Sequence, residues 1–167
     1  LGKNFKLKLK DTKFKNLFII EIEPINDNRG FFARVWDKEI FQEMGLNYNF
    51  VQSSISHNLK KGTLRGMHYQ VHPNEEAKLV HCFKGKIFDV VIDLRSNSKT
   101  YLQKFEIELD SEDNKSLFIP EGFAHGFQTL DDDTDIYYQI SQFFKPESAR
   151  GILWNDSFFN INWPISD

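Results

Sequence analysis

The chain has 167 residues, of which 40% are hydrophobic and 27% are charged. These proportions are typical of a globular protein, and the length suits a single domain over residues 1–167. The formal net charge of −3 gives no reason to expect nucleic acid, and no apolar run approaches the ~20 residues of a membrane span. The lysine-rich residues 1–15 lack the apolar core of a secretory signal. A single cysteine, Cys82, cannot form an internal disulfide, which favours the cytoplasm.

Alternation of apolar and polar residues with a period of two, the pattern of β-strands, runs through most of the chain. The strands that this pattern predicts cover residues 16–23, 50–57, 63–70, 77–84, 86–94, 101–109, 116–119 and 135–143. One segment, Asp37 to Met44, is predicted to be a helix, with Asp37 as its N-cap and Gly45 just past its end. Many short strands with one or two short helices predict an all-β sandwich, jelly roll or barrel.

Two predicted strands carry charged residues on faces that are otherwise apolar. Lys78 shares a face with Val80 and Cys82, and an inward lysine costs free energy unless it has a partner. It is therefore either a solvent-exposed lysine at the end of its strand or a functional residue. Asp89 can also point inward by alternation and could orient Lys78. Cys82 is expected to fill the core rather than to act as a nucleophile.

The segment Thr63 to Gln70 concentrates polar residues that a strand does not require. Within it, Arg65 and His68 are an odd number of residues apart, so they would point to opposite faces of a regular strand. Gly66 lies between them and could mark a β-bulge that brings the two side chains together.

The segment Pro120 to His125 has the Pro-x-Gly-x-x-His spacing of the second cupin motif. A metal-binding cupin would pair this motif with His-x-His, but the earlier segment reads His68-Tyr69-Gln70 and lacks the second histidine. His68 and His125 without a suitably spaced carboxylate make a poor metal site. His72 and Glu76 belong to a hydrophilic loop, so no metal is predicted.

These segments together resemble the dTDP-4-dehydrorhamnose 3,5-epimerase family of sugar-nucleotide epimerases, which belongs to the cupin superfamily. The resemblance covers nearly the whole chain. Its most specific parts are the Leu-Arg-Gly-Met-His-Tyr-Gln and Gly-Phe-Ala-His-Gly-Phe blocks in the correct order. The matching segments, in chain order, are residues 27–32, 52–54, 62–70, 78–80, 89–95, 119–127, Tyr138, 154–156 and 163–164.

The resemblance implies a cupin jelly roll that inverts carbon centres beside the C4 ketone of a nucleoside-diphosphate 4-keto-6-deoxy sugar. The ketone acidifies the hydrogens on C3 and C5, so the reaction needs a base, an acid on the other face and enolate stabilisation. In the family, the histidine matching His68 is the base, and the lysine matching Lys78 lies near the keto oxygen. The tyrosine matching Tyr138 returns the proton. No cofactor is required.

The resemblance also implies how the substrate is held. The binding residues are those matching Arg29, Gln52, Ser54, Arg65, His125 and Phe144. Arginine suits the diphosphate because its planar fork offers paired donors. A homodimer is implied, with dTDP-4-dehydro-6-deoxy-D-glucose as substrate in deoxysugar and rhamnose biosynthesis for a polysaccharide.

The sequence departs from the family pattern at three places. Phe144 stands where the family often has a tyrosine that stacks on the base, and Arg34 stands where some members have a glutamate. The family's basic histidine is typically paired with an aspartate beyond the Trp-Pro motif. Here the sequence ends at Asp167, which lies at the wrong distance to match that aspartate.

Other interpretations remain open on the sequence alone. Tyr138 shares a face with Ile136 and Ile140 and could be a core tyrosine, and Arg29 could cap a turn. A relative that epimerises only C3 or C5, on the same or another nucleotide sugar, would share the same motifs. A metal-dependent cupin and a non-catalytic sugar-nucleotide-binding cupin are the alternatives from other classes.

Overall fold

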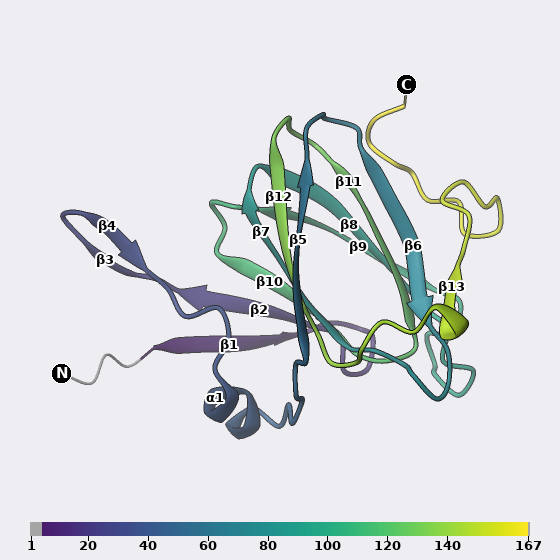
Figure 1. Cartoon of the computed structure of the whole chain (residues 1–167), viewed down its shortest axis with the longest axis horizontal. Coiled ribbons are helices and arrows are strands. Elements are labelled where there is room, and N and C mark those ends of the chain that lie inside the picture. Colours follow the sequence, from purple (N-terminus) through teal and green to yellow (C-terminus); the bar gives the residue numbers. More distant parts are fainter. Residues whose placement is uncertain (1–4, 167) are drawn as a thin grey trace.

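The computed structural model describes residues 5–166 and is dominated by antiparallel strands in two facing sheets (Figure 1). The larger sheet has six strands, in the spatial order β1 (Lys6–Asp11), β2 (Phe18–Glu23), β10 (Lys115–Ile119), β7 (Lys78–Lys84), β12 (Thr134–Ile140) and β5 (Gln52–Asn58). The second has five strands, in the order β13 (Ala149–Gly151), β6 (Leu64–Gln70), β11 (Phe123–Thr129), β8 (Lys86–Asp93) and β9 (Lys104–Asp110). This two-sheet sandwich confirms the predicted jelly roll.

The inner faces of the two sheets form the main core. Val80 of β7, Leu117 of β10 and Ile136 of β12 meet Ile87 and Val91 of β8 there, and all five are fully buried. Because aliphatic side chains of this size each contribute about 1.5–3 kcal/mol on burial, this layer holds the sheets together. Cys82 lies in the same layer, and burial raises the pKa of its thiol to about 12, so its prediction as core filler is confirmed.

The outer face of each sheet is covered by a segment from a different end of the chain. The helix α1 (Lys38–Glu43) inserts Phe41 into a cluster on the outer face of the six-stranded sheet. Its predicted N-cap is confirmed, since the Asp37 carboxylate accepts hydrogen bonds from two backbone N–H groups. The 3-10 turn η1 (Pro146–Ser148) is the second short helix. The C-terminal segment covers the five-stranded sheet, packing Ile161 and Trp163 beside Val90 of β8.

The predicted strands all occur, with shifted ends. The strand predicted at 101–109 begins at Lys104, because the preceding residues turn back onto Asp93, whose carbonyl accepts from the Leu102 N–H. The sequence patterns do not reveal β1, β11, β13 or the two short strands at residues 25–27 and 30–32. In β11 every residue is buried, so the alternation that marks a half-exposed strand is absent.

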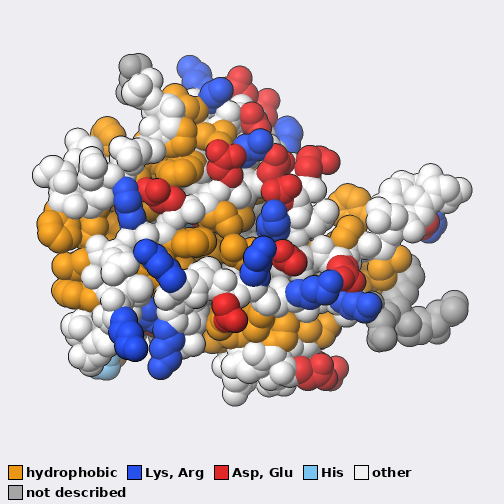
Figure 2. Space-filling view, turned by 180° about the vertical axis from the view of Figure 1, so that it is seen from behind, with side chains coloured by type: hydrophobic (Ala, Val, Ile, Leu, Met, Phe, Trp, Pro, Cys, Tyr) orange, Lys and Arg blue, Asp and Glu red, His pale blue; other side chains and the backbone are white. Residues whose placement is uncertain are grey.

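A two-stranded hairpin, β3 (Ile25–Asp27) and β4 (Gly30–Phe32), projects from the sandwich beside the N-terminal strands (Figure 1). Two of its side chains, Phe31 and Phe32, are 65% and 55% exposed. Seen from the opposite side, the surface intersperses cationic and anionic side chains with small apolar patches (Figure 2). No helix among residues 5–166 is long and apolar enough to span a bilayer.

Candidate active site

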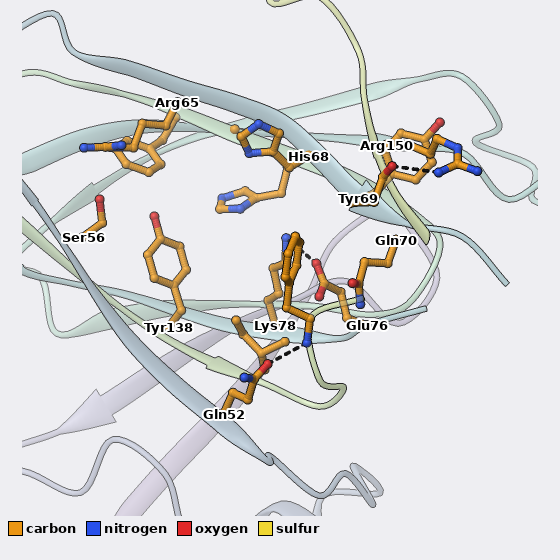
Figure 3. Close-up of a pocket in the computed structure, with 16 residues that line it drawn as sticks. Gln52, Ser56, Arg65, His68, Tyr69, Gln70, Glu76, Lys78, Tyr138 and Arg150 are labelled. Atoms are coloured by element: carbon orange, nitrogen blue, oxygen red, sulfur yellow. Dashed lines mark hydrogen bonds and ion pairs between the residues drawn. The ribbon is translucent and has the colours of Figure 1, made fainter. Parts of the chain in front are cut away.

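A cavity of about 610 Å³ opens between the inner faces of the two sheets (Figure 3). It is lined by Gln52, Ser56, Arg65, His68, Tyr69, Gln70, Glu76, Lys78, His125, Gly126, Phe127, Tyr138, Ile140, Phe144, Ala149 and Arg150. The volume suits a ligand of the size of a nucleotide sugar. Seven of the predicted site residues line it, namely Gln52, Arg65, His68, Lys78, His125, Tyr138 and Phe144.

Arg65 and His68 reach the cavity together because β6 carries the bulge that Gly66 suggested. In the pairing with β11, His68 lies opposite His125 while Arg65 lies opposite Phe127, so β6 has one extra residue. Gly66 has φ +115°, and a Cβ there would lie 2.5 Å from the Gly126 Cα. Only glycine fits this crossing, and the bulge turns both side chains to the same face.

Lys78 points into the cavity at the start of β7, which confirms the inward lysine. Its Nζ lies 2.9 Å from Oε1 of Glu76, and each side chain is 12% exposed. The expectation that Asp89 orients Lys78 is wrong. Asp89 belongs to the facing sheet and contacts His125. The carboxylate that contacts the Lys78 ammonium is that of Glu76, two residues before it. The polar surroundings of Glu76 in the sequence had indicated only a hydrophilic loop.

Asp89 instead holds His125. In the β8–β11 pairing Asp89 lies opposite Phe127, which places it diagonally beside His125 on the inner face. Nε2 of His125 lies 2.6 Å from Oδ1 of Asp89, and both side chains are buried. The second carboxylate oxygen, Oδ2, is buried without a hydrogen-bond partner. This pair fixes the imidazole at the cavity wall.

His68 is suited to accept a proton. Its pKa is lowered, first because partial burial disfavours the imidazolium and then because Lys78 and His125 lie nearby. Glu76 opposes this shift. The imidazole is therefore neutral at physiological pH, as a general base must be.

Tyr138 is suited to donate a proton. It extends from β12 on the opposite sheet, and its hydroxyl points toward the sheet that carries His68 (Figure 3). Burial, followed by the negative charge of Asp89, raises the pKa of the phenol well above its usual range. The hydroxyl is therefore protonated at neutral pH. Its position in the cavity wall counts against the interpretation of Tyr138 as a simple core residue.

Of the predicted binding residues, Gln52, Arg65, His125 and Phe144 line the cavity, whereas Ser54 and Arg29 do not. Gln52 lines the cavity, and its Oε1 accepts a hydrogen bond from the Phe144 N–H at 2.9 Å, which ties the exposed Phe144 ring to the rim. Ser54 lies on the same face of β5 but is exposed and outside the lining. Ser56, two residues further, lines the cavity instead, and continuing the alternation by one step would have found it.

Arg29 does not line the cavity of its own chain, and its role in substrate binding stays a prediction. It lies in the turn of the projecting hairpin, where its guanidinium is 2.7 Å from the Asp27 carboxylate. The backbone N–H of Arg29 donates a hydrogen bond to Asp27 Oδ1. Its side chain is 83% exposed. The turn-forming alternative therefore describes its local contacts.

Arg150 is a lining residue that the sequence patterns did not predict. It lies on β13 opposite Tyr69 of β6, and its guanidinium donates to the carbonyls of Glu147 and Ala149. The only sequence signal was a cation on a short strand, which is not distinctive. Across residues 5–166, no group of three or more His, Cys, Asp or Glu residues is arranged to hold a metal ion.

An antiparallel jelly roll with a histidine, a lysine and a tyrosine around a cavity between its sheets defines a cupin-type protein with an acid–base site. The chain belongs to the dTDP-4-dehydrorhamnose 3,5-epimerase family, whose model matches residues 11–167.

Similar proteins agree with this assignment. The dTDP-4-dehydrorhamnose 3,5-epimerase of Shigella flexneri is 40% identical over 157 residues, covering 93% of this chain and 86% of the relative. The structure of the enzyme of that name from Bacillus anthracis, with TDP and PPi bound, has a TM-score of 0.94 at 34% identity and covers 97% and 93% of the two chains. The dTDP-6-deoxy-D-glucose-3,5-epimerase of Legionella pneumophila, in complex with dTDP-4-keto-L-rhamnose, has a TM-score of 0.91 at 35% identity and covers 97% and 86%.

Proposed function

We propose that the chain, acting as one domain, epimerises C3 and C5 of a dTDP-4-keto-6-deoxy sugar, converting dTDP-4-dehydro-6-deoxy-D-glucose to dTDP-4-dehydro-L-rhamnose. The observation that carries this proposal is that His68 and Tyr138 lie on opposite sheets across one cavity, with Lys78 pointing into the same cavity (Figure 3). Inversion requires a base and an acid on opposite faces of the sugar, and this arrangement supplies both.

The proposed reaction leaves the atoms of the sugar unchanged. His68 removes the hydrogen from C3 or C5, and the electron pair of that C–H bond moves onto the C4 carbonyl oxygen to form an enolate. The Lys78 ammonium stabilises this oxygen by charge and hydrogen bonding. Tyr138 then donates its proton to the opposite face of the same carbon. Solvent restores both residues, and the same groups serve either carbon because the ketone lies between them.

The charges around the cavity support an anionic substrate. Three cations, Arg65, Lys78 and Arg150, line it with one carboxylate, Glu76. The Arg65 guanidinium is oriented by Asn58, whose Oδ1 accepts from Nε at 2.8 Å, and its remaining N–H groups suit phosphate oxygens. We assign the nucleobase to the rim at Phe144, and the sugar to His125 and Gln52.

We also propose that the chain works as a homodimer in the cytoplasm, where nucleotide sugars are made. The projecting hairpin supports the dimer, because it carries an exposed arginine and two exposed phenylalanines away from its own sandwich. In a twofold dimer such an arm would bring Arg29 to the cavity of the second copy.

Proton NMR in D2O with dTDP-4-dehydro-6-deoxy-D-glucose tests the proposed reaction. Wild-type protein is expected to introduce deuterium at both C3 and C5 and to form the L-rhamno product. The His68→Ala variant is expected to lower both rates by about 10²–10⁴-fold, the usual contribution of a general base. The Tyr138→Phe variant is expected to lose inversion more than exchange, because proton removal needs only His68.

Tyr137→Phe is the matched control. Tyr137 is the neighbouring tyrosine on β12, and it packs against Phe83 on the outer face of the sheet. Its variant should retain full activity. Deuterium incorporation at one carbon only would show that the protein is a mono-epimerase. Substrate binding without any deuterium incorporation would show that it is a non-catalytic sugar-nucleotide-binding protein.

A further inference from the structure

Glu76 and Lys78 enter the cavity as a fixed unit. The backbone of Ala77 between them is tied to Ser141 on both sides, since the Ala77 N–H donates to Ser141 Oγ at 2.8 Å and the Ser141 N–H donates to the Ala77 carbonyl at 3.0 Å. Ala77 is fully buried in the cluster behind β7. Residues two apart on an extended backbone point the same way, so Glu76 and Lys78 both face the cavity.

A carboxylate is an unexpected group in this place. The proposed substrate carries a diphosphate, and the proposed reaction develops negative charge on an oxygen beside Lys78, so Glu76 opposes both electrostatically. Taking a carboxylate out of water also costs free energy that only close pairing returns. Its contact with Lys78 at 2.9 Å supplies that pairing, which points to Lys78 as the reason for its position.

We propose that Glu76 is a positioning residue that holds the Lys78 ammonium in the orientation needed by the enolate oxygen, and that it also offsets the charge of Lys78 at His68. The inference rests on the proposed function. A lysine has four rotatable bonds and a compact charge, so an unrestrained Nζ would sample many positions. With one N–H held by Glu76, two N–H groups remain for the substrate oxygen.

The influence on His68 follows from the surrounding charges. The titratable and charged side chains that line the cavity together with His68 are Lys78 of β7, Glu76 before it, His125 of β11, Tyr138 of β12, Arg150 of β13, and Arg65 and Tyr69 of its own strand. Lys78 and His125 lower the pKa of His68, while Glu76 raises it. Without Glu76, the lysine charge would act on the base unopposed and make it a weaker proton acceptor.

The test compares Glu76→Gln and Glu76→Ala with the wild type by steady-state kinetics and deuterium exchange. Both variants are expected to lower kcat, by about ten-fold for alanine, with KM changed less than about two-fold. For Glu76→Gln, the acid limb of the pH–kcat/KM profile is expected to move to lower pH. The matched control is Glu75→Gln, which removes an adjacent carboxylate that pairs with His72 outside the cavity.

A double-mutant cycle shows whether Glu76 acts through Lys78. In a Lys78→Ala background, adding Glu76→Ala is expected to cause no further loss of kcat, because the positioned group is already gone. Thermal unfolding of every variant separates these effects from loss of folded protein. The inference alone would be overturned if both Glu76 variants kept the wild-type kcat and pH profile, or if Glu76→Gln were faster than the wild type. It would also be overturned if Glu76→Ala lowered kcat equally in the wild-type and Lys78→Ala backgrounds. A wild type that exchanges no hydrogen would instead overturn the proposed function, and with it the role of Glu76.

Discussion

Asp89 and His125 form a buried pair whose contact distance recurs in an exposed histidine–aspartate pair of the same protein. Nε2 of His125 lies 2.6 Å from Asp89 Oδ1, with side-chain exposures of 5% and 0%. On β5 and β12, Nδ1 of His57 lies 2.6 Å from Asp135 Oδ1, with exposures of 50% and 33%. The two pairs share their chemistry and distance and differ in burial, so the protein contains its own control for the effect of burial on such a contact.

The first prediction compares these pairs. Asp89→Ala is expected to lower the free energy of unfolding by about 3 kcal/mol, because it leaves a buried imidazole without its partner. Asp135→Ala is expected to cost less than about 1 kcal/mol, since water replaces an exposed partner. Urea denaturation measures both. Equal losses would show that burial does not strengthen the inner pair.

The second prediction concerns the bulge at Gly66. Gly66→Ala would place a methyl group 2.5 Å from the Gly126 Cα and 2.7 Å from the His125 carbonyl, so β6 and β11 must separate. Gly45 also has a positive φ, but a methyl group added there would meet open space within 4 Å, so Gly45→Ala isolates the backbone strain. We expect a loss of about 1 kcal/mol at Gly45 and of more than about 3 kcal/mol at Gly66, with exchange activity lost only at Gly66.

The third prediction is the pH dependence of the reaction. The base must be neutral, and the pKa of His68 is lowered from its ordinary value of 6.5. The rate of deuterium exchange should therefore rise with pH through a midpoint below 6.5 and be level at about pH 7 and above. A midpoint above 6.5 in kcat/KM would contradict the assignment of His68 as the base in this environment.

The fourth prediction concerns stability rather than catalysis. His81 is buried on the outer side of β7, where burial lowers its pKa to about 4, and its Nδ1 lies 2.9 Å from Ser116 Oγ. Because its pKa is 6.5 in the unfolded chain, unfolded protein takes up a proton first as the pH falls. Stability due to this residue should thus be present above pH 6.5 and decline towards pH 4, by about 3 kcal/mol in total.

Chemical denaturation at about pH 7 and about pH 4.5 measures this effect. His81→Gln removes the titrating group, so the variant should lose less stability than the wild type over that interval. An identical pH response in both proteins would show that His81 does not contribute to it.

The fifth prediction tests the arm of the proposed dimer. If Arg29 serves the cavity of the second copy, co-refolding Arg29→Ala with His68→Ala protein should restore about one quarter of wild-type activity. Half of the dimers are then mixed, and each mixed dimer has one site free of both substitutions. No recovery, in a mixture shown to exchange subunits, would place Arg29 outside the site or confine it to its own chain.

Sequence patterns predicted the fold well wherever one face of a strand was covered. The strand at 86–94 showed one apolar face and one face on which Asp89 and Asp93 alternate with apolar residues. Both faces proved to be buried, one in the main core and one beneath the C-terminal segment. β11 was missed because His125 and Gly126 interrupt its apolar run, although every residue in it is buried. Local pattern could not show that β6 and β8 shield those residues from either side.

Some residues of the site could be predicted from the sequence and others could not, because local pattern does not show which strands are neighbours. The position of Lys78 followed from alternation within a single strand. The partner of Asp89 depended on which strand lies beside β8, and this is a property of the sheet order rather than of the local sequence. Glu76 was overlooked because it lies in a polar segment of the sequence. The hydrogen bonds between the Ala77 backbone and Ser141 turn it inward, and no local pattern predicts them. The position of Arg29 depends on a hairpin whose direction no local pattern encodes.

The placement of His68 and Tyr138 on separate sheets has a consequence for how stereochemistry can change. The gap between proton acceptor and proton donor depends on the local thickness of the sandwich, whose interior is filled by Val80, Val91 and Ile136. A larger or smaller side chain at these hidden positions alters that thickness without touching the sugar. The ratio of hydrogen exchange to inversion is thus adjustable from the interior, and a lineage could drift from double to single inversion while every residue that contacts the ligand stays the same.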